Sequence, residues 1–278
     1  DELKQRGLDV DCISIDERHP TGYVEASLDD RGIASYEFPD DVAWDHLSLN
    51  RRALEIAPRL DAVCFGSLAQ RSPVSRQAIR RFLAKTSTKA LKIYDINLRQ
   101  TFYTQNTIIE SLELADMVKL NEEELPVMAG MLGITGKEGE MLETVVKRFG
   151  LKLAVLTRGG RGSLLVSPEE SSQHSGFTPT QIADTVGAGD SFTAVVTIGL
   201  LDGEDLQTIN ARANRVAAYV CSRTGAMPDL PSCFNCAIDR VVALWLMGIT
   251  RQVVRYKKPR CPRILFYPRF SADLHTAD

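Results

Sequence analysis

The sequence predicts an α/β fold: a doubly wound, mostly parallel sheet flanked by helices, with a partial β hairpin beside it. Two observations lead to this prediction. Short apolar segments alternate with helical stretches between residues 47 and 157, which is typical of parallel sheets with helices on both faces. Before them, residues 21–28 and 33–38 alternate apolar and polar side chains around the turn D-D-R-G, as in a hairpin.

The order of these elements indicates where ligands bind. The predicted strands are 61–65, 91–96, 117–120 and 153–157, and the glycine-rich segment 158–162 leads into another strand. The predicted helices are 47–57, 73–85, 107–114, 122–131 and 139–149. Because ligands of such sheets bind at the carboxyl ends of the strands, the loops that follow the strands are the candidate functional segments.

Composition excludes several classes of protein. The 278 residues are 44% hydrophobic and 25% charged, as in soluble globular proteins, and the net charge of −3 gives no general attraction to nucleic acid or anionic lipid. The longest strongly apolar stretch, residues 241–249, is far shorter than the ~20 residues of a membrane-spanning helix. We therefore expect a cytoplasmic protein with no nucleic-acid or membrane partner.

Charge and cysteine content set the last part of the chain apart. Residues 233–278 hold eight basic and three acidic residues, a net charge of +5, so residues 1–232 carry 25 − 33 = −8. Cys233 and Cys236 form a C-x-x-C pair, but only Cys261 and His275 follow them. A zinc site needs a second ligand pair, so we expect no metal or redox site here.

The segment 182–200 carries the clearest functional pattern. Gly187, Ala188 and Gly189 open an apolar helical run, so backbone N–H groups at the helix N-terminus are available to an anion such as a phosphoryl group. Asp190 follows in the first turn, where the helix dipole favours its ionised form. Phosphoryl transfer needs this combination of N–H donors and a proton acceptor, although a tight turn with a capping acid gives the same pattern.

Two further loops fit a nucleotide site. Asn121 and Glu124 follow a strand at a spacing that suits either a capping box or a site for Mg²⁺ and its waters. Thr157, Gly159 and Gly162 follow the next strand and allow a ligand to approach the backbone, but a simple turn explains them equally well. Neither the P-loop pattern near residues 130–138 nor a Rossmann glycine pattern is complete.

Taken together, these segments resemble the ribokinase-like sugar kinases, the phosphofructokinase-B family. The resemblance spans about residues 8–231 and rests on D-T-V-G-A-G-D-S-F (184–192), K-L-N-E-E-E-L (119–125), L-T-R-G-G-R-G-S (156–163) and A-N-R-V-A-A (213–218). Within the family, F-G-S-L-A-Q-R-S (65–72) and Y-D-I-N-L-R-Q (94–100) are most similar to bacterial fructokinases. The resemblance implies a kinase domain over residues 1–232 that lacks the family's first βα unit. The basic tail over 233–278 follows this domain.

The resemblance implies the reaction and its central residues. ATP would phosphorylate a sugar hydroxyl, and the product from fructose would be fructose 6-phosphate. Asp190 would be the base, and Gly187, Ala188 and Gly189 would form the anion hole. Arg99 would reach a phosphate or the sugar, unless it forms only a surface ion pair.

The resemblance also implies the cofactor contacts. Asn121 and Glu124 would organise Mg²⁺ and phosphate, with Glu124 acting through water. The nucleotide-binding positions would be Thr157, Gly159 and Gly162, with Asn214 near the adenine or ribose at the start of a late helix. Asp184, with the carbonyls around Val186 and Gly225, would hold a monovalent cation such as K⁺.

One departure from the family leaves alternatives open. The first strand, with its sugar-binding aspartate, and the Gly-Gly motif are not visible, so we expect the chain to begin after that unit. The acceptor could then be ribose, a ketodeoxy sugar acid or a nucleoside, or the chain could bind nucleotide without phosphorylating a sugar. The resemblance also implies that the hairpin at 22–38 belongs to the sheet or lid that covers the sugar, and it allows a homodimer through these lid strands.

Overall fold

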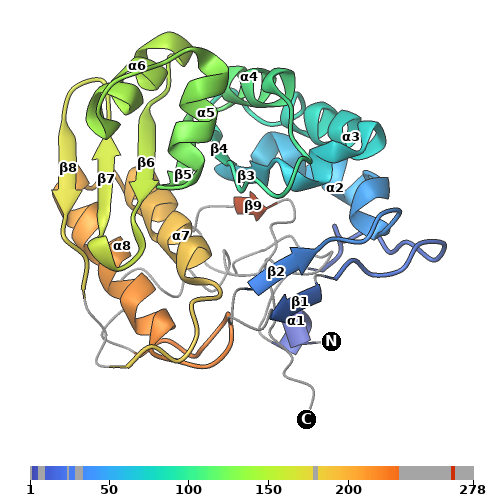
Figure 1. Cartoon of the computed structure of the whole chain (residues 1–278). Helices are drawn as coiled ribbons and strands as arrows, with labels where there is room; N and C mark the ends of the chain where they lie inside the picture. Colours follow the sequence, from blue (N-terminus) through green and yellow to red (C-terminus); the bar gives the residue numbers. More distant parts are fainter. Residues whose placement is uncertain are drawn as a thin grey trace.

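The structure, a computed structural model, describes residues 2–5, 10–23, 25–28, 34–177, 181–231 and 264–266 (Figure 1). The C-x-x-C pair and the rest of the basic tail, apart from residues 264–266, lie outside the described residues. A seven-stranded sheet in the order β8-β7-β6-β5-β4-β3-β9 forms the centre. A separate two-stranded sheet pairs β1 with β2.

The strands of the large sheet confirm the predicted fold class. The four predicted strands appear within one residue of their expected bounds, as β3 (Ala62–Gly66), β4 (Leu91–Asp95), β5 (Met117–Asn121) and β6 (Leu153–Thr157). These four are parallel, whereas β7 (Ser163–Val166) and β8 (Ser171–His174) extend the sheet in antiparallel fashion. The other edge strand, β9 (Ile264–Phe266), pairs in parallel with β3 and was not predicted.

Helices cover both faces of this sheet (Figure 1). One apolar core lies under α2 (Arg51–Ile56), α3 (Pro73–Leu83), α4 (Gln105–Leu114), α5 (Glu124–Leu132) and α6 (Glu138–Phe149). The second lies under α7 (Ala188–Asp202) and α8 (Leu206–Cys221). Because side chains alternate along a strand, Val63 and Phe65 of β3 enter the first core, while Ala62 and Cys64 enter the second.

The hairpin is confirmed, and the bounds of the five predicted helices differ from the observed ones by one to four residues. β1 (Glu25–Leu28) and β2 (Ala34–Glu37) are antiparallel, with Glu25 opposite Glu37. The helix expected at 47–57 begins only at Arg51, because the Asn50 side chain accepts the N–H of Ala53 at 2.8 Å and caps it there. The helix expected from residue 122 begins at Glu124.

A buried ion pair holds the segment after the hairpin against the sheet. Asp45, in the short helix η1 (Ala43–His46), accepts two hydrogen bonds of 2.7 and 2.6 Å from the Arg71 guanidinium. Arg71 also lies over the rings of Trp44 and Phe102, with its Cζ 5.6 and 4.6 Å from their centroids. This fork-to-fork geometry fixes η1 beside the carboxyl end of β3.

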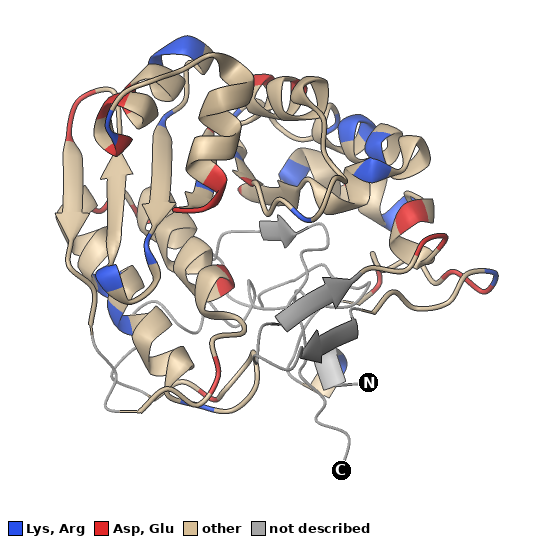
Figure 2. Ribbon diagram, viewed as in Figure 1, with Lys and Arg blue, Asp and Glu red and all other residues tan. Residues whose placement is uncertain are grey.

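Charged residues are distributed over both helical layers of the described structure (Figure 2). Basic positions gather on α3, where Arg80 pairs with Glu110 of the neighbouring α4. None of the described helices has both the length and the apolar character that crossing a membrane requires.

Candidate active site

The first turn of α7 has the conformation that the sequence predicts for an anion site. Gly187 is the N-cap residue and has a φ of +80°, a left-handed value that favours glycine. A Cβ at this position would lie 2.3 Å from the carbonyl oxygen of Ala226, so a larger residue does not fit. The turn therefore packs closely against the chain at residue 226, and a side chain at position 187 would disrupt this contact.

The N–H groups of this turn are only partly used by the protein. Within the described residues, the N–H groups of Gly187 and Gly189 donate to no backbone carbonyl, while Ala188 donates to the Thr185 carbonyl at 3.3 Å. Asp190 follows with 8% of its surface exposed, and Figure 2 shows an acidic position at this end of α7. Two amides and a carboxylate thus lie within one helical turn, which suits an anion beside a proton acceptor.

A buried polar chain holds this turn against the sheet. The Thr193 hydroxyl lies 3.0 Å from the Gly189 carbonyl oxygen and 3.0 Å from Asp95 Oδ2 at the end of β4. On its other oxygen, Asp95 lies 3.3 Å from Lys119 Nζ of β5. This polar chain was not predicted, although charged residues inside the apolar runs I-Y-D-I and M-V-K-L were its signal in the sequence. It places the predicted anion site at the carboxyl ends of β4 and β5.

Asn121 and Glu124 form a capping arrangement at the end of β5. Asn121 Oδ1 accepts the N–H groups of Glu123 and Glu124 at 2.9 Å, and Glu124 Oε2 accepts the N–H of Asn121 at 2.8 Å. The second oxygen, Oε1, accepts the N–H of Leu98 at 3.0 Å, and Glu124 is 4% exposed. Each carboxylate oxygen keeps a lone pair for a water molecule, which suits metal contact through water rather than directly.

Gly159 and Gly162, two of the three glycines in the loop after β6, have different roles. Gly162 has a φ of +84°, and a Cβ there would lie 2.0 Å from the carbonyl oxygen of His174 in β8, so packing within the sheet requires this glycine. Gly159 has a φ of +54°, and a Cβ added there would meet no atom within 4 Å, so space is open beside it.

Thr157, at the end of β6, forms hydrogen bonds with the neighbouring strand and the turn after it. The Thr157 hydroxyl donates to the Leu120 carbonyl over 3.4 Å, and the Thr157 carbonyl accepts the N–H of Glu122.

Asp184 joins two loops beside the first turn of α7. Its Oδ1 accepts the N–H of Val186 at 2.9 Å, and its Oδ2 accepts the N–H of Gly225 at 3.2 Å. Burial and the negative charge of Asp184 raise the pKa of the nearby Cys221 thiol. The structure therefore brings together all three residues that the resemblance associates with a monovalent cation.

Asn214 lies elsewhere than expected. Helix α8 begins at Leu206, so Asn214 lies within the helix and not at its start. Its amide nitrogen donates to Ser163 Oγ at 2.7 Å and to the Asn210 carbonyl at 2.8 Å, so it ties α8 to β7. The prediction failed on position because the capping residue Asp205, which accepts the N–H of Thr208, was not recognised.

The loop after β4 contains Arg99 and a second polar residue that was not predicted to take part in the site. Arg99 is half-buried and its Nη1 donates to the Leu98 carbonyl at 3.1 Å. Asn97 has a left-handed φ of +49° and is 1% exposed. Among the described residues, neither its amide oxygen nor its amide nitrogen has a hydrogen-bond partner. A buried amide in this state is costly, which makes Asn97 a candidate ligand contact.

Comparisons with known proteins identify the family of this chain. Residues 1–233 match the pfkB family of carbohydrate kinases. A putative sugar kinase of Pyrococcus horikoshii is 30% identical over 235 residues, which cover 81% of this chain and 71% of that protein. A fructokinase of Escherichia coli is 26% identical over 243 residues, which cover 82% of this chain and 76% of the fructokinase.

Solved structures show the same fold. The crystal structure of the Pyrococcus horikoshii sugar kinase in complex with ATP has a TM-score of 0.68 and 26% identity, and covers 88% of this chain and 78% of that one. A Vibrio cholerae fructokinase in a form with bound fructose, ADP and calcium ion has a TM-score of 0.65 and 24% identity, with 85% and 79% covered. With its family match over residues 1–233, the chain belongs to the pfkB family of carbohydrate kinases and is a phosphotransferase.

Proposed function

We propose that this chain phosphorylates the C6 hydroxyl of fructose with ATP and forms fructose 6-phosphate. The observation that carries the proposal is the first turn of α7, where Gly187 and Gly189 donate to no backbone carbonyl of the described residues and Asp190 follows in the same turn. The fructose assignment draws on the resemblance of segments 65–72 and 94–100 to bacterial fructokinases, and on the E. coli fructokinase relative.

The reaction is a transfer of one phosphoryl group. Asp190 takes the proton of the sugar hydroxyl while the hydroxyl oxygen bonds to the γ-phosphorus of ATP. The bond from that phosphorus to the bridging oxygen breaks, and ADP leaves with the electron pair. The amides of Gly187 and Gly189 hold the negative charge that spreads over the transferred group. Arg99, at the end of β4, would contact a phosphate or the sugar.

The remaining site residues would hold the cofactors. Bound Mg²⁺ would neutralise phosphate charge, and Asn121 with Glu124 would orient it through water molecules. Thr157 and the open backbone at Gly159 would border the nucleotide, beside the buried turn at Gly162. Asp184 would orient the carbonyls around Val186 and Gly225 toward a monovalent cation such as K⁺. Asn214 would act on the nucleotide indirectly, through β7.

A product assay over a panel of acceptors tests the proposal. The full chain is incubated with ATP, Mg²⁺ and either fructose, ribose, a ketodeoxy sugar acid or a nucleoside, and the phosphorylated product is identified by ³¹P NMR. We expect turnover with fructose and the phosphate on its C6 hydroxyl. Turnover only with another acceptor would overturn the fructose assignment and leave the kinase chemistry in place.

A variant of the proposed base tests the mechanism separately. Asp190→Asn preserves the size of the side chain but not its capacity to accept the proton. We expect turnover to fall by about 10²- to 10⁴-fold, the usual contribution of general-base catalysis, while calorimetry shows nearly unchanged ATP binding. If Asp190→Asn turns over at the wild-type rate, Asp190 is not the base.

A further inference from the structure

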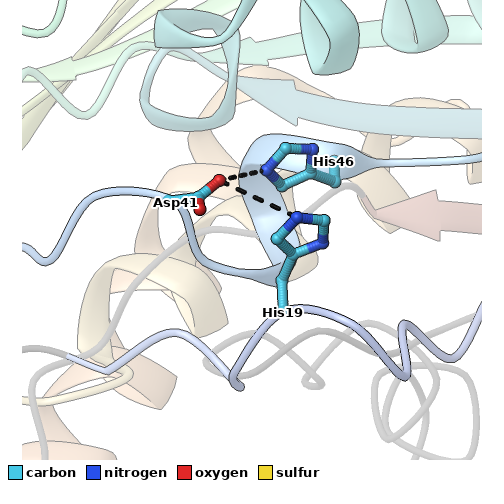
Figure 3. Close-up of side chains that lie close together, drawn as sticks. All are labelled: His19, Asp41 and His46. Carbon is cyan, nitrogen blue, oxygen red and sulfur yellow. Dashed lines mark hydrogen bonds and ion pairs between the residues drawn. The ribbon is translucent and has the colours of Figure 1, made fainter.

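A cluster of two histidines and one aspartate lies in the segments that precede and form η1 (Figure 3). It comprises His19, Asp41 and His46. The candidate ligand atoms of all three residues lie within 4.8 Å of one another. The two imidazole rings are stacked, with centroids 3.5 Å apart and planes 5° from parallel. No step of the kinase reaction uses this cluster.

The His19 ring is held in one orientation. Its Nδ1 lies 2.8 Å from Asp16 Oδ2, and Asp16 Oδ1 accepts the N–H groups of Arg18 and His19 at 2.8 and 3.2 Å. When Nδ1 carries the proton and donates it to Asp16, the Nε2 lone pair is presented on the opposite side of the ring. A carboxylate on the far nitrogen is the usual companion of a histidine that binds a metal.

The Nε2 atoms of both histidines face the same carboxylate oxygen. Asp41 Oδ1 lies 2.7 Å from His46 Nε2 and 3.8 Å from His19 Nε2. The histidine side chains are only 28% and 18% exposed, whereas that of Asp41 is 77% exposed. The two histidine side chains are therefore mostly buried, and the cluster is open to solvent on the side of Asp41.

We propose that His19, Asp41 and His46 form a binding site for a divalent transition-metal ion with the ligand preferences of Zn²⁺. The ligand atoms would be Nε2 of each histidine and Oδ1 of Asp41. Tetrahedral sites with bonds of about 2.0–2.2 Å place ligand atoms about 3.3 Å apart, between the 2.7 and 3.8 Å separations seen here. Because imidazole lone pairs lie in the ring planes, which are nearly parallel here, binding of one ion by both Nε2 atoms requires one ring to tilt out of the stack. Two imidazoles and a carboxylate leave a fourth position for water.

The ligand chemistry distinguishes this site from the kinase's own metal. Imidazole nitrogens suit Zn²⁺, Co²⁺, Ni²⁺ or Cu²⁺, whereas Mg²⁺ is bound by oxygen atoms. The ion would tie residues 16–20 to residues 41–46, two segments that already meet where the N–H of Ala43 donates to the Pro20 carbonyl at 2.9 Å. The proposed ion would thus cross-link two chain segments beside the buried ion pair of Asp45 and Arg71.

Metal titration of the full chain, prepared without a polyhistidine tag, tests the site. To remove the thiols of the tail, the starting protein carries Cys233→Ser, Cys236→Ser and Cys261→Ser. Isothermal titration with ZnCl₂ is expected to show one equivalent of Zn²⁺ bound, and Co²⁺ is expected to give the visible absorption of a tetrahedral ion without a sulfur charge-transfer band. The absence of a one-equivalent Zn²⁺ transition would overturn the proposal.

Variants identify the ligands. His46→Gln and Asp41→Asn preserve side-chain size and are expected to weaken Zn²⁺ binding at least 10-fold, and Asp16→Asn about 10-fold, as removal of outer partners does elsewhere. His174→Gln is the matched control, because His174 lies in β8 and contacts the N–H of Gly176 instead. Equal Zn²⁺ affinity in His46→Gln and wild type would also overturn the proposal.

Folding of each variant is checked independently of metal binding. Far-UV circular dichroism compares the apo proteins, and thermal unfolding is followed with and without Zn²⁺. A ligand-bound native state is stabilised, so Zn²⁺ is expected to raise the Tm of wild type and of His174→Gln but not of His46→Gln. A Zn²⁺-dependent rise in Tm that persists in His46→Gln would assign the binding to other residues.

Discussion

Lys119 of β5 and Asp95 of β4 form an ion pair inside the protein, with Nζ 3.3 Å from Oδ1 and with side chains that are 2% and 3% exposed. The other carboxylate oxygen accepts the Thr193 hydroxyl of α7. A single carboxylate therefore connects two strands of the sheet to the helix that opens with the proposed anion site.

Removing one partner of this pair is expected to destabilise the protein strongly. Lys119→Met leaves the Asp95 carboxylate buried without its cation, which costs about 3–5 kcal/mol of unfolding free energy. The double variant Lys119→Met with Asp95→Asn is expected to lose less than the two single losses together, because no lone charge stays buried. Urea unfolding of the four proteins measures this coupling, and strictly additive losses would contradict it.

The two glycines that flank α7 provide a matched test of the anion site. Gly187 and Gly203 have φ values of +80° and +73°, but only a Cβ at Gly187 meets another atom, the Ala226 carbonyl oxygen. Gly203→Ala is expected to cost about 1 kcal/mol for the left-handed conformation. Gly187→Ala adds an overlap with backbone and is expected to cost about 2–5 kcal/mol.

Kinetics on the same pair separates stability from function. Below the unfolding temperature, Gly203→Ala is expected to retain wild-type turnover, because it lies at the far end of α7. Gly187→Ala is expected to reduce turnover more than 10-fold, because the N–H groups move away from the transferred phosphoryl group. Equal turnover in the two variants would show that the turn is only structural.

Asn97 is expected to matter for ligand binding more than for folding. Its amide has no partner among the described residues, and glycine adopts the same left-handed φ, so Asn97→Gly is expected to change Tm little. If a bound ligand forms hydrogen bonds with the Asn97 amide, the turnover of Asn97→Gly at low substrate concentration is expected to be about 10- to 100-fold below that of wild type. Asn210→Ala is the contrasting control: its hydrogen bonds to Ser163 and Ser172 are buried, so its Tm falls. A large loss of Tm in Asn97→Gly would contradict this interpretation.

The cap of α8 is expected to make stability depend on pH. Hydrogen bonds from Thr208 hold the pKa of Asp205 below its ordinary value. The bond from the backbone N–H has the larger effect, and the bond from the hydroxyl has the smaller one. A lowered folded-state pKa stabilises the native protein above the unfolded pKa of about 3.9, and this stabilisation is lost as the pH falls through the folded value. Asp205→Asn keeps a capping oxygen that does not titrate.

Thermal unfolding across pH therefore compares wild type with Asp205→Asn. The wild-type advantage in Tm is expected at pH 7 and diminishes as the pH is lowered below about 5. A Tm difference that stays constant from pH 7 to pH 3 would show that the carboxylate charge contributes nothing.

The strands of the parallel sheet were predictable because each is a short apolar run with polar residues at both ends. The glycine turn of α7 was predictable for a similar reason: G-A-G before an apolar helix allows few conformations. The hydrogen-bond partners of individual side chains were not predictable. Sequence spacing cannot show that both oxygens of Glu124 accept backbone N–H groups, or that Asn97 is buried without a partner among the described residues, because these depend on segments that meet only in the folded chain.

Strand β9 has a consequence for the order of events during synthesis. It pairs with β3 across about 200 residues of sequence, as in the partners Ala62 and Ile264, whereas the other paired strands of the sheet follow one another along the chain. Contacts between such distant segments form late, because closing the long loop between them costs conformational entropy before the contacts stabilise it. On a ribosome, β3 emerges long before its last neighbour. Until residue 266 has left the exit tunnel, one border of the nascent sheet offers its hydrogen-bonding groups to chaperones or to other nascent chains.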